Sequence, residues 1–409
     1  MTRADPLSLY LHIPFCSLKC SYCDFNSYAG IESLMRPFVD ALCDEMRLWA
    51  PFMADRHVGT VFFGGGTPSL LPLEEVERIM AAMRKAFDLA PGAEVSFEAN
   101  PGTVNRDYFR GLLTAGVNRI SFGVQSFHDD ELAALDRIHS AEEAKEAYRW
   151  AREAGFARIN LDLIYGLMEQ PLDRWQATLE QAIALAPEHL SLYALTVEEG
   201  TKLAHDIERG RAPAPDGDMQ AEMYEWSCER LASEGYRQYE ISNWCRPGEE
   251  CRHNLVYWRN GEWLGLGPGA HSHLGGNRQG EDGNRGWRFA DVYSPKQYIE
   301  RVRETVEAIG PSRVRPDASH LREMAQVAFV EEQTAEMEIA DTAILGLRLN
   351  EGLDVGEFER RFGRTLDEVY GPVLEETASL GLLERENGCV RLTERGLLLA
   401  NEVFVRLLA

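Results

Sequence analysis

Residues 9–23 read LYLHIPFCSLKCSYC, an apolar run followed by three closely spaced cysteines, Cys16, Cys20 and Cys23. Three thiolates on one loop can each bind one iron of a cubane cluster and leave the fourth iron without a protein ligand. Zinc also binds thiolates, but its sites usually take a second ligand pair further along the chain, and no matching pair follows. A ferredoxin would add a fourth cysteine, and none stands at a suitable spacing. The pattern predicts a [4Fe–4S] cluster beside a buried strand.

The segments that follow the cysteines alternate between short β-branched or aromatic runs and longer amphipathic stretches. Strands that are apolar on both faces and alternate with helices indicate parallel βα units. Because a closed barrel needs eight such units, six units predict an α/β fold with a partial, TIM-like (β/α)6 barrel. The predicted strands are Leu9–Ile13, Thr60–Phe63, Glu94–Glu98, Arg119–Val124, Arg158–Ile164 and His189–Leu195, and the predicted helices are Leu34–Trp49, Leu73–Phe87, Arg106–Thr114, Glu142–Glu153 and Leu172–Leu185.

Glycine and charged residues stand where these strands end. Residues 64–68 read GGGTP after the second strand, and missing side chains there let backbone groups approach a ligand. Glu98, Gln125 and Asp162 lie at or just beyond three further strand ends, and Arg137 lies in the segment after the fourth. Parallel barrels collect their ligand groups at this rim, so these residues are candidates for cofactor binding. A solvated edge is the alternative for any one of them.

The second half of the chain does not continue the strand–helix alternation, and the sequence predicts further divisions there. We expect a barrel domain over 1–207, and over 208–310 a linker, a helix, a strand and a Gly- and aromatic-rich region from Trp258 to Trp287 that suits loops near a ligand. Over 311–409 we expect helices and a hairpin turning at Asn387-Gly388, a winged-helix-like α+β domain that ends in the helix Glu394–Leu408. Residues 341–409 carry 13 acidic and 8 basic side chains, which disfavours a role in DNA binding.

The composition of the chain disfavours some classes of binding partner. The 409 residues carry a net charge of −24, so non-specific binding to nucleic acid or anionic lipid is not expected. No apolar run approaches the roughly 18 residues of a spanning helix, and Leu7–Phe15 lacks the features of a secretory signal. Eight cysteines, three of them clustered, fit metal or redox chemistry in a cytoplasmic protein better than disulfides.

The CxxxCxxC loop resembles that of the radical S-adenosylmethionine superfamily, and four further segments resemble its oxygen-independent coproporphyrinogen III oxidase-like branch. They are LYLHIPFC at 9–16, FGGGTP at 63–68, SFGVQSF at 121–127 and DLIYGL at 162–167. The resemblance implies that the open iron binds S-adenosylmethionine, whose reductive cleavage gives a 5′-deoxyadenosyl radical. It also implies a set of residues in contact with S-adenosylmethionine: Tyr10, Tyr22, Gly65, Gly66, Thr67, Glu98, Gln125, Arg137 and Asp162.

Within this branch the sequence departs from the oxidases. They carry another cysteine two positions after the third ligand, where this chain has Phe25, and a sizeable extension before the cluster, where this chain has fifteen residues. Both departures resemble the heme chaperone group. Residues 253–258 contain HNxxYW, the motif associated with heme in that group, which makes His253 a candidate axial ligand. The other heme candidates are Asn254, Tyr257 and Trp258, with His271 and His273 ranked lower.

The leading hypothesis is therefore a protein that binds heme and transfers it to respiratory acceptor proteins, with a [4Fe–4S] cluster and S-adenosylmethionine in its scaffold. The alternatives are an oxygen-independent coproporphyrinogen III oxidase and a radical enzyme that modifies the heme ring. An electron donor to the cluster and a homodimer are further expected partners. Cys245, Cys251 and His253 form a weaker candidate for a small metal site.

Overall fold

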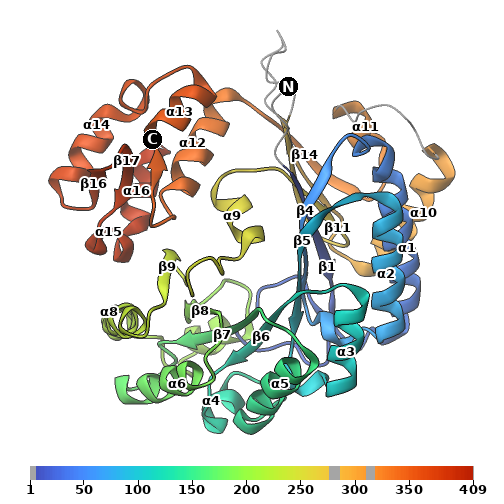
Figure 1. Cartoon of the computed structure of the whole chain (residues 1–409), viewed down its shortest axis with the longest axis horizontal. Coiled ribbons are helices and arrows are strands. Elements are labelled where there is room, and N and C mark those ends of the chain that lie inside the picture. The colour runs from blue at the N-terminus through green and yellow to red at the C-terminus, as the bar shows by residue number, and fades with distance from the viewer. Residues whose placement is uncertain (1–5, 276–285, 310–317, 409) are drawn as a thin grey trace.

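Six parallel strands form the wall of a partly open barrel in the computed structural model, which describes residues 6–275, 286–309 and 318–408 (Figure 1). These strands lie side by side in sequence order, as short crossover connections require. The predicted α/β partial barrel is confirmed. The six strands are β1 (Leu7–Ile13), β4 (His57–Gly65), β5 (Asp88–Ala99), β6 (Arg119–Gln125), β7 (Ile159–Tyr165) and β8 (His189–Ala194).

Amphipathic helices cover the outside of this wall (Figure 1). Their apolar faces and the strands share one hydrophobic core, which contains fully buried Phe38, Phe97 and Trp175. Capping sets the bounds of α5, where the Ser140 hydroxyl and the Glu143 carboxylate satisfy each other's backbone N–H groups. The helices are α1 (Met35–Trp49), α2 (Leu73–Ala86), α3 (Arg106–Ala115), α4 (Asp129–Ala134), α5 (Ala141–Ala154) and α6 (Leu172–Ala184).

The sheet continues beyond both ends of the six-stranded wall, which the sequence did not indicate. It has 12 strands over the described residues, in the order β14-β13-β12-β11-β1-β4-β5-β6-β7-β8-β10-β9. Strand β11 is parallel to β1, and the other added strands pair antiparallel. The added strands are β9 (Arg237–Glu240), β10 (Asn243–Cys245), β11 (Trp263–Leu266), β12 (His271–Gly275), β13 (Gly286–Asp291) and β14 (Val327–Gln333).

Two local predictions are corrected here. The Gly- and aromatic-rich region contains β11, β12 and the start of β13 rather than loops alone, and its residues 276–285 lie outside the described part. These strands were not predicted because their glycines weaken the sequence pattern of a strand. Glycine nevertheless occurs in strands where two backbones approach closely. The single strand expected within 208–310 is two antiparallel strands, β9 and β10, because the chain turns at residues 241–242 between them. Three helices accompany them: the short α7 (Lys202–Glu208) and α9 (Arg252–Trp258), and the 17-residue α8 (Gly217–Ser233).

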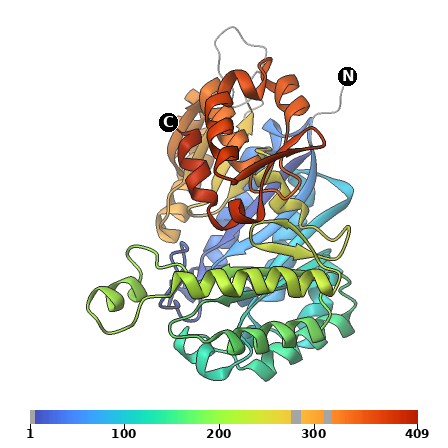
Figure 2. The same ribbon diagram turned by 90° about the vertical axis from the view of Figure 1, so that its left-hand side faces the viewer.

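The C-terminal residues form a second core beside the barrel, above the edge that carries α8 (Figures 1 and 2). Its hairpin turns where predicted, with positive φ at Asn387 and Gly388. The predicted closing helix is interrupted at Leu399. The elements are α12 (Ala335–Gly346), β15 (Leu353–Asp354), α13 (Val355–Phe362), α14 (Leu366–Ser379), β16 (Leu383–Glu386), β17 (Cys389–Leu392), α15 (Glu394–Leu398) and α16 (Ala400–Leu407); α10 (Pro295–Ile309) and α11 (Ala318–Glu323) precede them.

The domain divisions at 207 and 310 stay predictions, although β14 pairs with β13 and so places residues 327–333 in the large sheet. Within the described ranges, none of the helices is both long and apolar enough to span a membrane. Short helix α9 contacts α12 and lies between the barrel strands and the C-terminal domain (Figure 1).

Candidate functional site

A cavity of about 360 Å³ opens at the carboxyl ends of the barrel strands. It is the place where a parallel barrel presents its ligand groups, because successive strand ends and their loops converge there. The structure brings most of the predicted cluster and cofactor residues together around it. Those in its lining are Cys16, Cys20, Tyr22, Cys23, Gly65, Gly66, Thr67, Glu98, Gln125, Arg137 and Asp162.

The cysteine loop is held against this cavity from two sides. The Cys16 thiol lies 3.6 Å from the Thr67 hydroxyl, and an Arg137 N–H reaches the Cys20 sulfur at 3.7 Å. Asp136 accepts a hydrogen bond from the backbone N–H of Ser21 at 3.2 Å. The loop is therefore positioned by the segment after β6, which also supplies a cation next to a cysteine sulfur.

Glycine is required at the turn after β4. Gly65 has φ +112°, and a Cβ there would come within 2.8 Å of the His12 ring. At Gly66, a Cβ would lie 2.6 Å from the Phe15 carbonyl oxygen and 3.1 Å from the Cys16 sulfur. The turn can pass this close to the cysteine loop only without side chains. The backbone of residues 65–67 is thereby exposed to the cavity beside Cys16.

Two carboxyl groups on the cavity wall have raised pKa values. Burial, together with the nearby Asp162 carboxylate, raises the pKa of Glu98 to about 8. Burial also raises the pKa of Asp162, against hydrogen bonds from Ser121 and Asn160 that favour its charged form. Paired acidic groups with raised pKa values in a cavity are typical of a site that binds a cation or a polar cofactor.

Arg137 and Gln125 complete the polar wall. Arg137 donates to the Gly123 carbonyl at 2.8 Å, while its buried Nε has no hydrogen-bond partner within the described part of the chain. Gln125 has φ +69°, a left-handed conformation that a non-glycine residue adopts only at a cost. An unused guanidinium donor and a strained backbone at one wall indicate a binding site rather than a packed edge.

The donor set fits an iron–sulfur cluster. All three cysteines are free, partly exposed and on the cavity wall. Over the described residues, no group of three His, Cys, Asp or Glu side chains is arranged to hold a metal ion. A cubane requires no such convergence, because each of its irons takes one thiolate. The arrangement suits a cluster on Cys16, Cys20 and Cys23 better than a single zinc ion.

Tyr10 is the one predicted cofactor contact outside the cavity lining. Its hydroxyl donates to Nδ1 of His12 at 3.1 Å, and Nε2 of His12 donates to the Asn26 carbonyl at 2.8 Å. Tyr10 therefore lies behind the site, in a chain of hydrogen bonds that ends in the cysteine loop. Sequence reasoning missed the end of β8, where Tyr193 lines the cavity with a 42% exposed side chain. The rim rule that selected Asp162 on β7 applies to β8 as well.

The HNxxYW residues form a separate group on α9, away from the cavity lining. The His253 side chain is 1% exposed. Its Nδ1 lies 2.8 Å from the Thr60 hydroxyl, which itself donates to Ser8, and its Nε2 lies 2.9 Å from the Tyr257 hydroxyl. Burial lowers the pKa of His253 to about 3, so the ring is neutral. Both ring nitrogens are thus engaged inside the protein.

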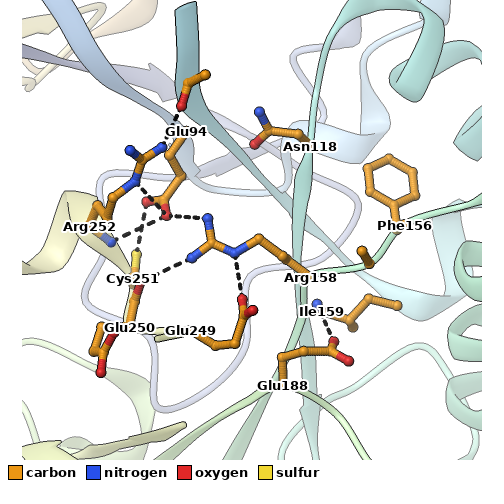
Figure 3. A network of polar contacts seen from close by, with 12 residues as sticks. Glu94, Asn118, Phe156, Arg158, Ile159, Glu188, Glu249, Glu250, Cys251 and Arg252 are labelled. Carbon is orange, nitrogen blue, oxygen red and sulfur yellow. Dashed lines mark hydrogen bonds and ion pairs between the residues drawn. The ribbon is translucent and has the colours of Figure 1, made fainter. Parts of the chain in front are cut away.

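A buried carboxylate anchors α9 to the floor of the barrel (Figure 3). Glu94, on β5, accepts hydrogen bonds from the backbone N–H groups of His253 at 3.0 Å and Arg252 at 3.3 Å, and pairs with Arg158 at 3.0 Å. Burial alone would raise the pKa of Glu94, but the charges of Arg119 and Arg158 and these N–H donors lower it. Glu94 therefore caps the first turn of α9 as an ion.

The lower-ranked candidates are placed elsewhere. His271 and His273 lie on β12; His273 is 4% exposed, and its Nδ1 lies 3.0 Å from the Gly261 carbonyl oxygen. Cys245 and Cys251 are buried free thiols, and burial raises the pKa of each to about 12. A metal site would need their thiolates, which this environment opposes.

Comparison with known proteins agrees with this geometry. Residues 10–182 match the radical SAM superfamily, and residues 333–399 match the HemN C-terminal domain. Coproporphyrinogen III oxidase (HemN) from Escherichia coli, described as a radical SAM enzyme, has a similar structure, with a TM-score of 0.80 and 25% identity over 99% of this chain and 90% of that chain. The fold and the cysteine site thus define a radical SAM protein.

Two curated relatives identify the family within the radical SAM superfamily. The heme chaperone HemW of Mycobacterium tuberculosis is 39% identical over 99% of this chain and 95% of its own length. The heme chaperone HemW of Bacillus subtilis is 35% identical over 97% of this chain and 98% of its own. The chain belongs to the HemW family of radical SAM proteins. The resemblance proposed from the sequence is confirmed, and membership of the superfamily implies a [4Fe–4S] cluster and S-adenosylmethionine as cofactors.

Proposed function

We propose that this protein binds heme and transfers it to acceptor proteins, including respiratory ones, on a scaffold that also carries a [4Fe–4S] cluster and S-adenosylmethionine. The observation that carries the proposal is the 39% identity, across 99% of this chain, to a protein named heme chaperone HemW. A cytoplasmic location, an electron donor to the cluster and a homodimer stay predictions of this proposal.

The cavity residues have distinct roles in this proposal. Cys16, Cys20 and Cys23 hold the cluster, and the cluster with S-adenosylmethionine supplies radical chemistry when both are bound. The exposed backbone of Gly65 and Gly66 contacts the cofactor. The remaining proposed contacts are Tyr22, Thr67, Glu98, Gln125, Arg137 and Asp162, with Tyr10 acting from behind through His12.

Heme is assigned to the α9 region, where His253, Asn254, Tyr257 and Trp258 lie. Axial ligation of heme iron by His253 stays a prediction, and it would break one of the two side-chain contacts that the imidazole ring makes. Ligation through Nε2 requires Tyr257 to release the ring, and ligation through Nδ1 breaks the contact with Thr60. Tyr257 and Trp258 are aromatic side chains of the kind that stacks on a porphyrin.

The second candidate function is coproporphyrinogen III oxidation, favoured by the structural similarity to HemN. Against it stands Phe25, a 62% exposed side chain beside the cavity at the position where the oxidases carry their additional cysteine. An exposed phenylalanine offers neither a thiolate nor a proton at this position. We therefore rank the chaperone first.

One experiment separates the candidates. The anaerobic, cluster-loaded protein is titrated with ferric heme and, separately, incubated with coproporphyrinogen III, S-adenosylmethionine and a reductant. We expect one heme per chain, recovered with unchanged mass, and no protoporphyrinogen IX. The triple variant Cys16→Ala, Cys20→Ala, Cys23→Ala should lose the broad visible absorption of the cluster and still bind heme, because α9 lies outside the cavity lining. Steady decarboxylation would overturn the chaperone function, and a heme of changed mass would favour a heme-modifying enzyme.

A further inference from the structure

Arg348, just after α12, carries a guanidinium that the protein leaves short of partners. Its nearest carboxylate oxygen, on Glu240, lies 3.9 Å away, beyond hydrogen-bond distance. Its Nε is buried without a hydrogen-bond partner, and within the described residues the guanidinium makes no hydrogen bond through its other nitrogens. Its side chain is 27% exposed. Arginine presents five N–H donors in a fixed fork, so this is a half-buried cation with its donors unused.

This cation lies against α9, the helix that carries the HNxxYW motif. The Arg348 guanidinium lies over the Trp258 ring, 4.4 Å from its centroid. Trp258 is four residues after Asn254 on α9, which places the two side chains on one face of the helix, while His253 and Tyr257 occupy the neighbouring face. Asn254 is partly exposed and makes no side-chain hydrogen bond to a described residue. Asn254, Trp258 and Arg348 therefore form a surface with an aromatic ring, an amide without a hydrogen-bond partner among the described residues, and a guanidinium whose N–H donors are unused.

The side chains of this surface are suited to the edge of heme where the porphyrin ring carries its propionate carboxylates. A porphyrin is a flat apolar ring that stacks on aromatic side chains, and heme carries two propionate carboxylates that need cationic donors where water is partly excluded. Guanidinium and carboxylate form two parallel hydrogen bonds, which the Glu240 carboxylate at 3.9 Å does not make. Glu240 keeps Arg348 charged and placed, and its other oxygen is engaged by the Asn243 amide.

We propose that Arg348 binds a propionate carboxylate of heme, with Trp258 and Asn254 as the adjoining wall. This inference rests on the proposed function and adds to it a cation from the C-terminal side of the chain. It also explains why α9 is placed between the barrel and α12: the aromatic wall and the cation come from different parts of the chain and meet there.

The test compares heme with its dimethyl ester, in which both carboxylates are masked. The full-length protein, Arg348→Gln and Arg348→Lys are titrated with each porphyrin, and Arg259→Gln serves as the matched control, because Arg259 is exposed next to Trp258 and pairs with Glu351. We expect Arg348→Gln to weaken heme binding by about 10- to 100-fold and to leave ester binding unchanged. Arg348→Lys should restore part of the heme affinity, and Arg259→Gln should change neither.

The ester titration also reports on folding, since a variant that binds the ester normally has an intact aromatic wall. Equal losses for heme and ester in Arg348→Gln, or no loss for heme, would overturn the role of Arg348 while leaving heme binding by the wild type in place. A wild-type protein that binds neither porphyrin would overturn the proposed function and this inference together.

Discussion

Glu94 and Glu98 are two acidic residues on the same strand, β5, and both are enclosed by the barrel, yet their environments are opposite. Glu94, at the floor, receives two backbone N–H bonds and lies among arginines, and its pKa is lowered. Glu98, at the rim, lies beside Asp162, and its pKa is raised to about 8. Four residues along one strand thus separate a carboxyl group whose pKa the fold lowers from one whose pKa it raises.

The difference shows what each end of the barrel does. The floor is complete without a ligand, because Glu94 ties β5, α9 and Arg158 into one ion network (Figure 3). The rim leaves two neighbouring carboxyl groups and an unused Arg137 donor facing a cavity. Sites that must bind a charged cofactor are built with such uncompensated groups, at a cost in stability that the rest of the fold offsets.

Replacing Glu94 should give the largest effect on stability. Glu94→Gln leaves Arg158 and Arg119 without their buried counter-ion, so we expect the free energy of unfolding to fall by about 3–5 kcal/mol. Because the pKa of Glu94 is lowered from 4.5, its contribution is present above that pH and is lost as the pH falls through the lowered pKa. Urea unfolding followed by tryptophan fluorescence measures the loss.

Glu142→Gln is the control for this substitution. Glu142 pairs with Arg149 on the outside of α5, where both side chains are more than half exposed. Such a pair contributes about 0–1 kcal/mol. If Glu94→Gln destabilised the protein no more than Glu142→Gln does, the floor network would not be the structural element that we describe.

At the rim, the main effect should fall on cofactor affinity rather than on folding. Glu98→Gln or Arg137→Gln should weaken S-adenosylmethionine binding by about 1.5–3 kcal/mol, the value of a charge-assisted hydrogen bond. Calorimetric titration of the cluster-loaded variants measures it, and cluster absorption should be retained. Glu199→Gln, an exposed residue outside the cavity lining, is the matched control. Unchanged affinity in both rim variants would assign Glu98 and Arg137 to a solvated edge.

The sequence predicted the rim far better than the floor. The parallel βα units, the cysteine loop and the residues at the strand ends were predicted from periodicity and spacing, which are local signals. Two partners of Glu94, the backbone N–H groups of Arg252 and His253, lie more than a hundred residues away in the sequence, and no local pattern joins them to it. The same reasoning applies to Arg348 and Trp258, which meet only because α9 and the C-terminal domain pack together. Strands β11 and β12 were missed because glycine and histidine obscured their pattern.

The smallest expected effect sharpens the contrast between the two carboxyl groups. Because Glu98 has a raised pKa in the folded protein, the unfolded chain ionises first as the pH rises from 4.5 toward 8, and the wild type loses stability over that range. Glutamine does not titrate, so the cofactor-free Glu98→Gln variant should become more stable than the wild type as the pH increases. We expect an advantage of about 1–2 kcal/mol at pH ~9, less than full linkage because the side chain contacts water in the cavity, and little difference near pH ~4.5.

Urea unfolding of wild type, Glu98→Gln and Glu94→Gln across this range measures the difference. Glu94→Gln, measured below pH 4.5 as well, should show the reverse dependence: its deficit increases as the pH rises from the lowered pKa to 4.5 and is nearly constant above it. A Glu98→Gln protein that is less stable than the wild type at high pH would mean that the Glu98 carboxylate is compensated within the fold, as Glu94 is.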